Sequence, residues 1–165
     1  MSDFTVSIKC PPYLKQFYIK MCGGTHPVTL RKGSPESALV KVLLEIRPEA
    51  APPDIPADDD LIIFLPYSKA KDPRVFNWLS PKAKEALLEF IRSHFDRKIW
   101  YDIGIIRELP RRLDALIEAW MLANGIEITD TNYQAVIKRF RRMQKLDADA
   151  SRKRKKYTRL SDPSA

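Results

Sequence analysis

The sequence predicts an α+β protein with a small mixed N-terminal half and an all-helical C-terminal half. Three observations support this fold class. Apolar and polar residues alternate over residues 4–10, which is typical of a half-buried strand. Residues 61–65 form an uninterrupted apolar run between an aspartate and a proline, as in a buried strand. From residue 80 onward, apolar side chains recur at spacings of three and four, which indicates helices.

Two Ser-Pro pairs, at residues 34–35 and 80–81, have the pattern of helix starts. Serine is a favoured N-cap because its hydroxyl accepts a hydrogen bond from a free amide of the first turn, and proline suits the first helical position. Apolar residues with helical spacing follow both pairs. We therefore expect amphipathic helices over residues 34–47 and 80–95.

The other N-terminal segments are shorter or less regular. Residues 13–21 have apolar side chains at helical spacing ahead of a Gly-Gly pair, which favours a helix, although their aromatic content also permits a strand. Residues 26–30 form a short extended candidate. The proline-rich stretch 48–60 and the polar and aromatic stretch 66–79 are expected to be long loops.

A pair of helices is predicted over residues 110–146. Pro110 opens the first helix, and Asn124 with Gly125 ends it as a C-cap. Thr129 or Asp130 caps the second helix. The apolar residues of this second helix fall on a single stripe and consist of Tyr133, Val136, Ile137, Phe140 and Met143.

The opposite face of the second helix is polar and basic. It carries Gln134, Lys138, Arg141, Arg142 and Lys145, with Arg139 on its flank and Asn132 at its beginning. Two helices joined by a short turn, the second with a basic outer face, have the layout of a helix-turn-helix, and residues 80–106 could supply a third helix. Lysine and arginine side chains would contact phosphates, whereas Asn132 and Gln134 have the amide geometry that pairs with adenine edges.

Most of the excess positive charge of the chain lies near its C-terminal end. The chain has a net charge of +8, and residues 130–165, with eleven lysines and arginines against four aspartates, account for +7 of it. Such an asymmetry suggests an anionic partner, most commonly nucleic acid. The last residues form a basic tail that is expected to be a disordered arm adding phosphate contacts, and its basic residues are Arg152, Lys153, Arg154, Lys155, Lys156 and Arg159.

These patterns divide the chain into three parts. Residues 1–79 form a mixed α/β module, residues 80–147 a helical unit resembling a helix-turn-helix, and residues 148–165 a basic disordered tail. A single continuous domain over residues 1–147 is the alternative. Both divisions leave the basic helix and the tail at one end of the chain.

No catalytic or metal-binding motif stands out. The chain has five glycines and no glycine-rich phosphate loop, and it lacks the Gly-x-Ser-x-Gly motif of a serine nucleophile. The four soft ligands are too dispersed for the spacing of a structural zinc site, and they are Cys10, Cys22, His26 and His94. The acidic triplet at residues 58–60 lies in a proline-rich loop before a strand, which favours a hydrated loop over a magnesium site. We expect no enzymatic activity, no metal and no cofactor.

The sequence therefore predicts a non-enzymatic protein that binds duplex DNA through the helix over residues 130–146 and the basic arm. One alternative is a structural or interaction component that binds an acidic protein; another is an RNA-binding protein; a third is a helical hairpin whose basic face is only solvated. No apolar run reaches the about 20 residues of a membrane span. The N-terminal residues lack the features of a signal peptide and there are only two cysteines, so a cytoplasmic location is expected.

Overall fold

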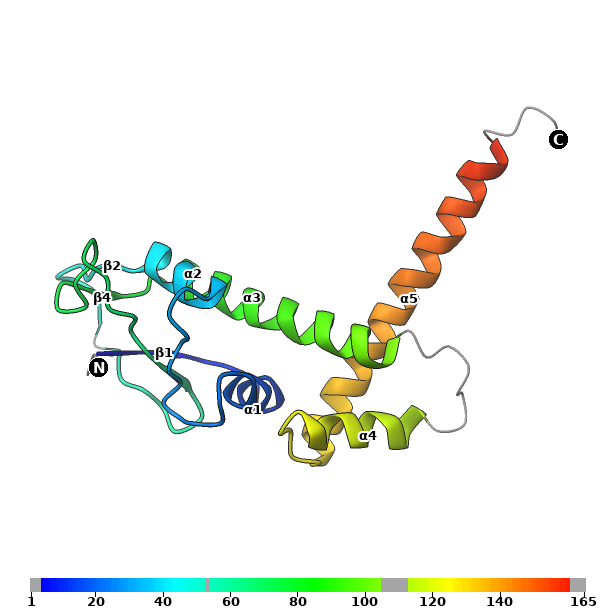
Figure 1. Cartoon of the computed structure of the whole chain (residues 1–165), viewed down its shortest axis with the longest axis horizontal. Coiled ribbons are helices and arrows are strands. Elements are labelled where there is room, and N and C mark those ends of the chain that lie inside the picture. Colours follow the sequence, from blue (N-terminus) through cyan, green and yellow to red (C-terminus); the bar gives the residue numbers. More distant parts are fainter. Residues whose placement is uncertain (1–3, 53, 105–112, 161–165) are drawn as a thin grey trace.

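The computed structural model describes residues 4–52, 54–104 and 113–160, and within α5 it describes side chains as far as residue 154. This part of the chain contains five α-helices, one π-helical turn (η1) and two small antiparallel sheets, which confirms the predicted α+β class (Figure 1). In chain order the elements are β1 (Thr5–Ile8), α1 (Pro12–Met21), α2 (Pro35–Leu43), β2 (Glu45–Ile46), β3 (Leu61–Phe64), β4 (Phe76–Trp78), α3 (Pro81–Ile99), η1 (Trp100–Gly104), α4 (Leu113–Ala123) and α5 (Asp130–Leu160).

The first sheet pairs the two strands that the sequence predicts. β1 and β3 are antiparallel, with Val6 opposite Ile63. The predicted extended segment near residue 28 lies beside β3, where the Val28 amide donates to the Ile62 carbonyl at 2.8 Å. His26 accepts a hydrogen bond from the Ile62 amide through Nε2 at 3.1 Å, and burial together with the charge of Lys15 lowers the pKa of His26. The lowered pKa keeps this acceptor nitrogen unprotonated at neutral pH.

The second sheet lies where the sequence predicted the end of a helix, within residues 34–47, and a loop, over residues 66–79, so both predictions are corrected. The helix expected over residues 34–47 ends at Leu43, since Leu44 adopts an extended conformation and buries its side chain. The chain then enters β2, which pairs with β4 inside the segment expected to be a loop over residues 66–79. This pairing joins residues about thirty positions apart, so no local pattern in the sequence indicates it.

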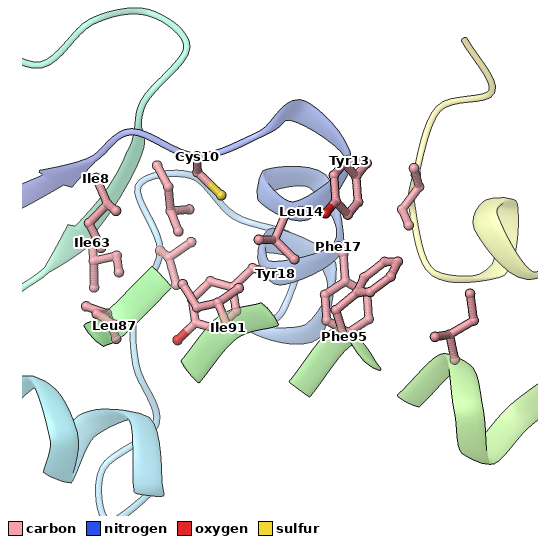
Figure 2. Close-up of a cluster of buried hydrophobic side chains, with 14 of the residues drawn as sticks. Ile8, Cys10, Tyr13, Leu14, Phe17, Tyr18, Ile63, Leu87, Ile91 and Phe95 are labelled. Carbon is pink, nitrogen blue, oxygen red and sulfur yellow. The ribbon is translucent and has the colours of Figure 1, made fainter. Parts of the chain in front are cut away.

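α1 is a helix, as favoured, and it packs on α3; in Figure 1 it lies just beyond the end of β1 and below α3. α3 runs four residues further than expected because its buried side chains continue at every fourth position, at Ala83, Leu87, Ile91, Phe95 and Ile99. Figure 2 shows three of these side chains, Leu87, Ile91 and Phe95, meeting the side chains of α1 in the core.

Phe95 lies at the centre of an aromatic cluster that joins three helices. Its ring makes edge-to-face contacts with Tyr13, Phe17 and Trp120, with centroids 5.2, 5.1 and 5.4 Å away. Trp120 belongs to α4, and its indole Nε1–H donates to Asp102 of η1 at 2.8 Å. The buried side chains of the N-terminal and C-terminal halves therefore form one continuous cluster.

α5 begins against this core and ends far from it. Its predicted apolar stripe is confirmed, because Val136, Ile137 and Phe140 are buried and Tyr133 and Met143 pack against the core. The prediction that the chain is disordered from residue 148 is wrong as far as Leu160, since α5 is one helix to that residue. Alanine, lysine and arginine are strong helix formers, so a helix already nucleated by packing propagates through the Asp-Ala-Asp-Ala stretch. Residues 161–165 of the predicted tail lie outside the described residues.

Replacement of Phe140 with alanine tests the docking of α5. The ring is 1% exposed and lies 6.2 Å from the ring of Trp100, so its loss leaves a cavity. We expect Phe140→Ala to lower the free energy of unfolding by about 3–5 kcal/mol, measured by denaturant titration. Leu146→Ala, at a position 60% exposed on the same helix, should change it by less than about 0.5 kcal/mol. Equal effects of the two substitutions would contradict this docking.

Candidate nucleic-acid interface

The turn between α4 and α5 is closed at both ends by capping interactions. Gly125 has a φ of 73°, a left-handed conformation that glycine adopts without strain. The amide of Ile126 donates to the Met121 carbonyl at 2.9 Å, which completes a Schellman cap at the predicted end of α4. Thr129 caps α5, because its Oγ1 accepts a hydrogen bond from the Asn132 amide at 3.2 Å. Of the two predicted caps, the structure therefore selects Thr129.

The first turn of α5 is covered by α1. Gln16 Oε1 of α1 accepts hydrogen bonds from the Glu127 amide at 3.0 Å and from Asn132 Nδ2 at 3.2 Å. Asn132 Nδ2 also donates to the Glu127 carbonyl at 3.0 Å, and the residue is only 3% exposed. We call this arrangement of Gln16, Glu127 and Asn132 the amide clasp.

The amide clasp corrects the base-reading role predicted for Asn132. Its side-chain amide is buried and bonded within the protein, so it does not face solvent as a base contact requires. A helix-turn-helix presents the N-terminal end of its second helix to the groove. Here Asn132 at that end is docked on α1, whereas the basic side chains of α5 that are exposed begin further along the helix, at Lys138. Sequence reasoning missed Gln16, which lies 116 residues before its partner and has no distinguishing pattern around it.

Arg139 is held by α3 instead of facing outward. Its Nε and Nη2 donate to the two carboxylate oxygens of Asp96, the second at 2.7 Å. Burial opposes the charge of Arg139, but the hydrogen bond and the charge of Asp96 outweigh burial and raise its pKa. The predicted phosphate contact at Arg139 is therefore corrected: this side chain orients α5 against α3 in a bidentate pair.

The remaining predicted residues of α5 share one exposed side of the helix. At about 100° per residue, six basic side chains fall within a sector of about 120°. We call this set the basic stripe; all six are exposed, and they are Lys138, Arg141, Arg142, Lys145, Arg152 and Lys153. With a rise of about 1.5 Å per residue, the stripe is about 22 Å long. Gln134 is exposed one turn before it, on the same side of the helix.

Like charges are neighbours along the basic stripe. Lys138 and Arg142 are four residues apart, as are Arg141 and Lys145, and such pairs destabilise a helix by about 0.2–0.5 kcal/mol each. A helix surface that is stabilised by salt bridges alternates charges of opposite sign, and these four positions do not. In the described part of the stripe, the acidic residue is Asp149, whose carboxylate lies 4.0 Å from Arg152. The stripe therefore has an unbalanced positive potential that a polyanion would neutralise.

Further basic residues belong to the end of α5. Arg154 is exposed, but it lies on another side of the helix. The sequence places Lys155, Lys156 and Arg159 in the last turns of α5, and their side chains lie outside the described part of the structure. The residues predicted as a separate flexible arm and those of the predicted recognition helix are thus carried by a single rod.

Three further properties of the described residues concern thiols, metal ligands and membranes. Burial raises the pKa of Cys10 to about 12 and that of Cys22 to about 11, so both thiols are protonated at neutral pH. Among these residues, no three of the types His, Cys, Asp and Glu gather closely enough to hold a metal ion. Across the same residues, every helix is either too short or too polar to span a bilayer.

A double-mutant cycle tests the amide clasp. We expect Asn132→Ala to lower the free energy of unfolding by about 1–3 kcal/mol, because it leaves buried polar groups unsatisfied. Gln16→Ala should have a similar effect, and the two losses should be coupled by about 0.5–3 kcal/mol in denaturant unfolding. Additive effects would mean that the two side chains do not act as one unit.

Comparison of the sequence with protein-family models and with curated proteins, and of the structure with solved structures, gives no significant match. A proposal for function therefore depends on the geometry and the charge of the basic stripe.

Proposed function

We propose that this protein binds duplex DNA through the basic stripe of α5, without catalysis. The observation that carries the proposal is the row of exposed cations on one side of a helix that projects from the body (Figure 1). DNA carries one negative charge per about 1.7 Å of its axis, so a straight row of cations about 22 Å long can lie beside several phosphates.

Binding of this kind is driven by the release of counterions from the DNA. Each stripe side chain that neutralises a phosphate adds affinity without distinguishing the bases. Gln134 stays a prediction for a base contact, since its exposed amide adjoins the stripe. The main contribution to the affinity for DNA is thus independent of the base sequence.

An acidic protein is a less suitable partner for this surface. Protein interfaces derive most of their affinity from buried aromatic and apolar anchors surrounded by a polar rim. Over described residues 134–154, the sector of α5 that the basic stripe occupies holds no aromatic or large aliphatic side chain, and the exposed Leu146 lies just beside it. A surface of cations without anchors favours a uniform polyanion over a folded acidic partner.

Removal of three stripe charges tests the proposal. The variant Lys138→Gln, Arg142→Gln, Lys145→Gln should weaken binding to a duplex DNA of mixed sequence, measured by fluorescence anisotropy at several salt concentrations. Its log-log salt slope should become shallower by about 0.9 for each phosphate that the variant no longer neutralises. The stability of the variant should stay close to that of the parent, because the three side chains are exposed.

The matched control removes the same charge elsewhere. Lys32, Lys69 and Lys82 are exposed and come from parts of the chain that precede the C-terminal helices. The variant Lys32→Gln, Lys69→Gln, Lys82→Gln should retain both the affinity and the salt slope of the parent. If both triple variants lose affinity equally, net charge alone is responsible and the proposed role of the stripe is wrong.

A further inference from the structure

The distribution of charge around α5 changes along its length. Between Lys138 and Lys145 the exposed basic side chains occupy one side of the helix, since the opposite side packs on the core. At Arg152, Lys153 and Arg154 three consecutive residues are exposed and basic. Consecutive helical residues lie about 100° apart, so these three cations extend over about 200° of the circumference.

This second part of the helix also stands apart from the body of the protein. We call residues 146–160 the projecting segment; in Figure 1 it extends away from every other labelled element. At about 1.5 Å per residue it is about 21 Å long. A flat anionic surface would meet the cations on only one side of the helix, whereas cations spread over about 200° suit a partner that faces the helix from two sides. The same segment also contains Asp147 and Asp149, so its positive charge comes from the residues after Ser151.

We infer that the projecting segment lies lengthwise in the major groove of B-form DNA, with phosphates of both strands beside it. This inference rests on the proposed function. The major groove is about 12 Å wide, and an α-helix with its side chains is about 10–12 Å across. Its two walls are lined by phosphates, so Arg152 and Lys153 would face one strand while Arg154, about 160° around the helix from the centre of the basic stripe, would face the other.

The same geometry selects among nucleic acids. The major groove of an A-form RNA duplex is deep and narrow, so an α-helix does not fit in it. A single strand has no second wall of phosphates. The groove inference therefore predicts tighter binding to a DNA duplex than to an RNA duplex of the same sequence and length, at equal salt concentration.

A pair of single substitutions separates groove insertion from one-sided contact. Arg152→Gln removes a stripe charge, and Arg154→Gln removes a charge about 160° around the helix from the centre of the stripe. With phosphates on both sides, each variant should bind duplex DNA several-fold more weakly than the parent in anisotropy titrations. If Arg154→Gln binds like the parent while Arg152→Gln is weakened, the helix lies flat on the DNA and groove insertion is overturned.

Binding to a DNA duplex with modified bases is the second measurement that tests groove insertion. A duplex whose cytosines carry glucosylated hydroxymethyl groups has a filled major groove and unchanged phosphate charge, and it should bind the full chain at least tenfold more weakly than plain duplex DNA. Equal affinity for the two duplexes, or for the matching RNA duplex, would overturn the groove inference and leave the proposed function standing. Failure to bind any of these duplexes would overturn the proposed function as well.

Discussion

The docking of the first half of α5 against α1 and α3 is the interaction on which the remaining structure depends. Val136, Ile137 and Phe140 are buried in the same cluster as Phe95, which itself contacts rings from α1 and α4. Because an α-helix is a stiff rod, fixing these few residues also fixes the direction of the projecting segment. The basic stripe is therefore held in one orientation relative to the body.

Two polar contacts make that orientation specific. Apolar packing is non-directional, so polar contacts of defined geometry add to the specificity of the docking. The amide clasp holds the first turn of α5 on α1, and the pair between Arg139 and Asp96 holds its third turn on α3. Each requires one register of the helix, because a shift of a single residue turns these side chains by about 100°.

Local signals in the sequence account for most of the helical architecture. The Ser-Pro pairs, the Gly125 cap and the apolar stripe of α5 depend on residues within a few positions of one another, so they can be recognised without knowing the fold. The continuation of α5 was missed for a different reason. The Asp-Ala-Asp-Ala stretch buries little and resembles a linker, yet its alanines favour a helix once the preceding turns are docked.

The features that local patterns cannot indicate all involve distant partners. β2 forms only with β4, Asn132 is buried only because Gln16 covers it, and Arg139 is occupied only because Asp96 faces it. The basic stripe itself was predictable as a set of residues. That these residues form one straight surface was not predictable, because this requires the helix to continue beyond residue 146.

We expect the exposed cations of α5 to act as one rod, and the sharpest test is to break that rod without changing its charge. Ala148→Pro interrupts the helix at an exposed position, at a cost of about 3 kcal/mol to local helix formation, and leaves every basic residue in place. We expect the proline variant to bind duplex DNA more weakly and to show less helical circular dichroism, with an unchanged unfolding midpoint; Ala148→Gln is the helix-compatible control. Full affinity in the proline variant, together with the loss of helical signal, would show that a flexible basic arm suffices and that a continuous helix is not required.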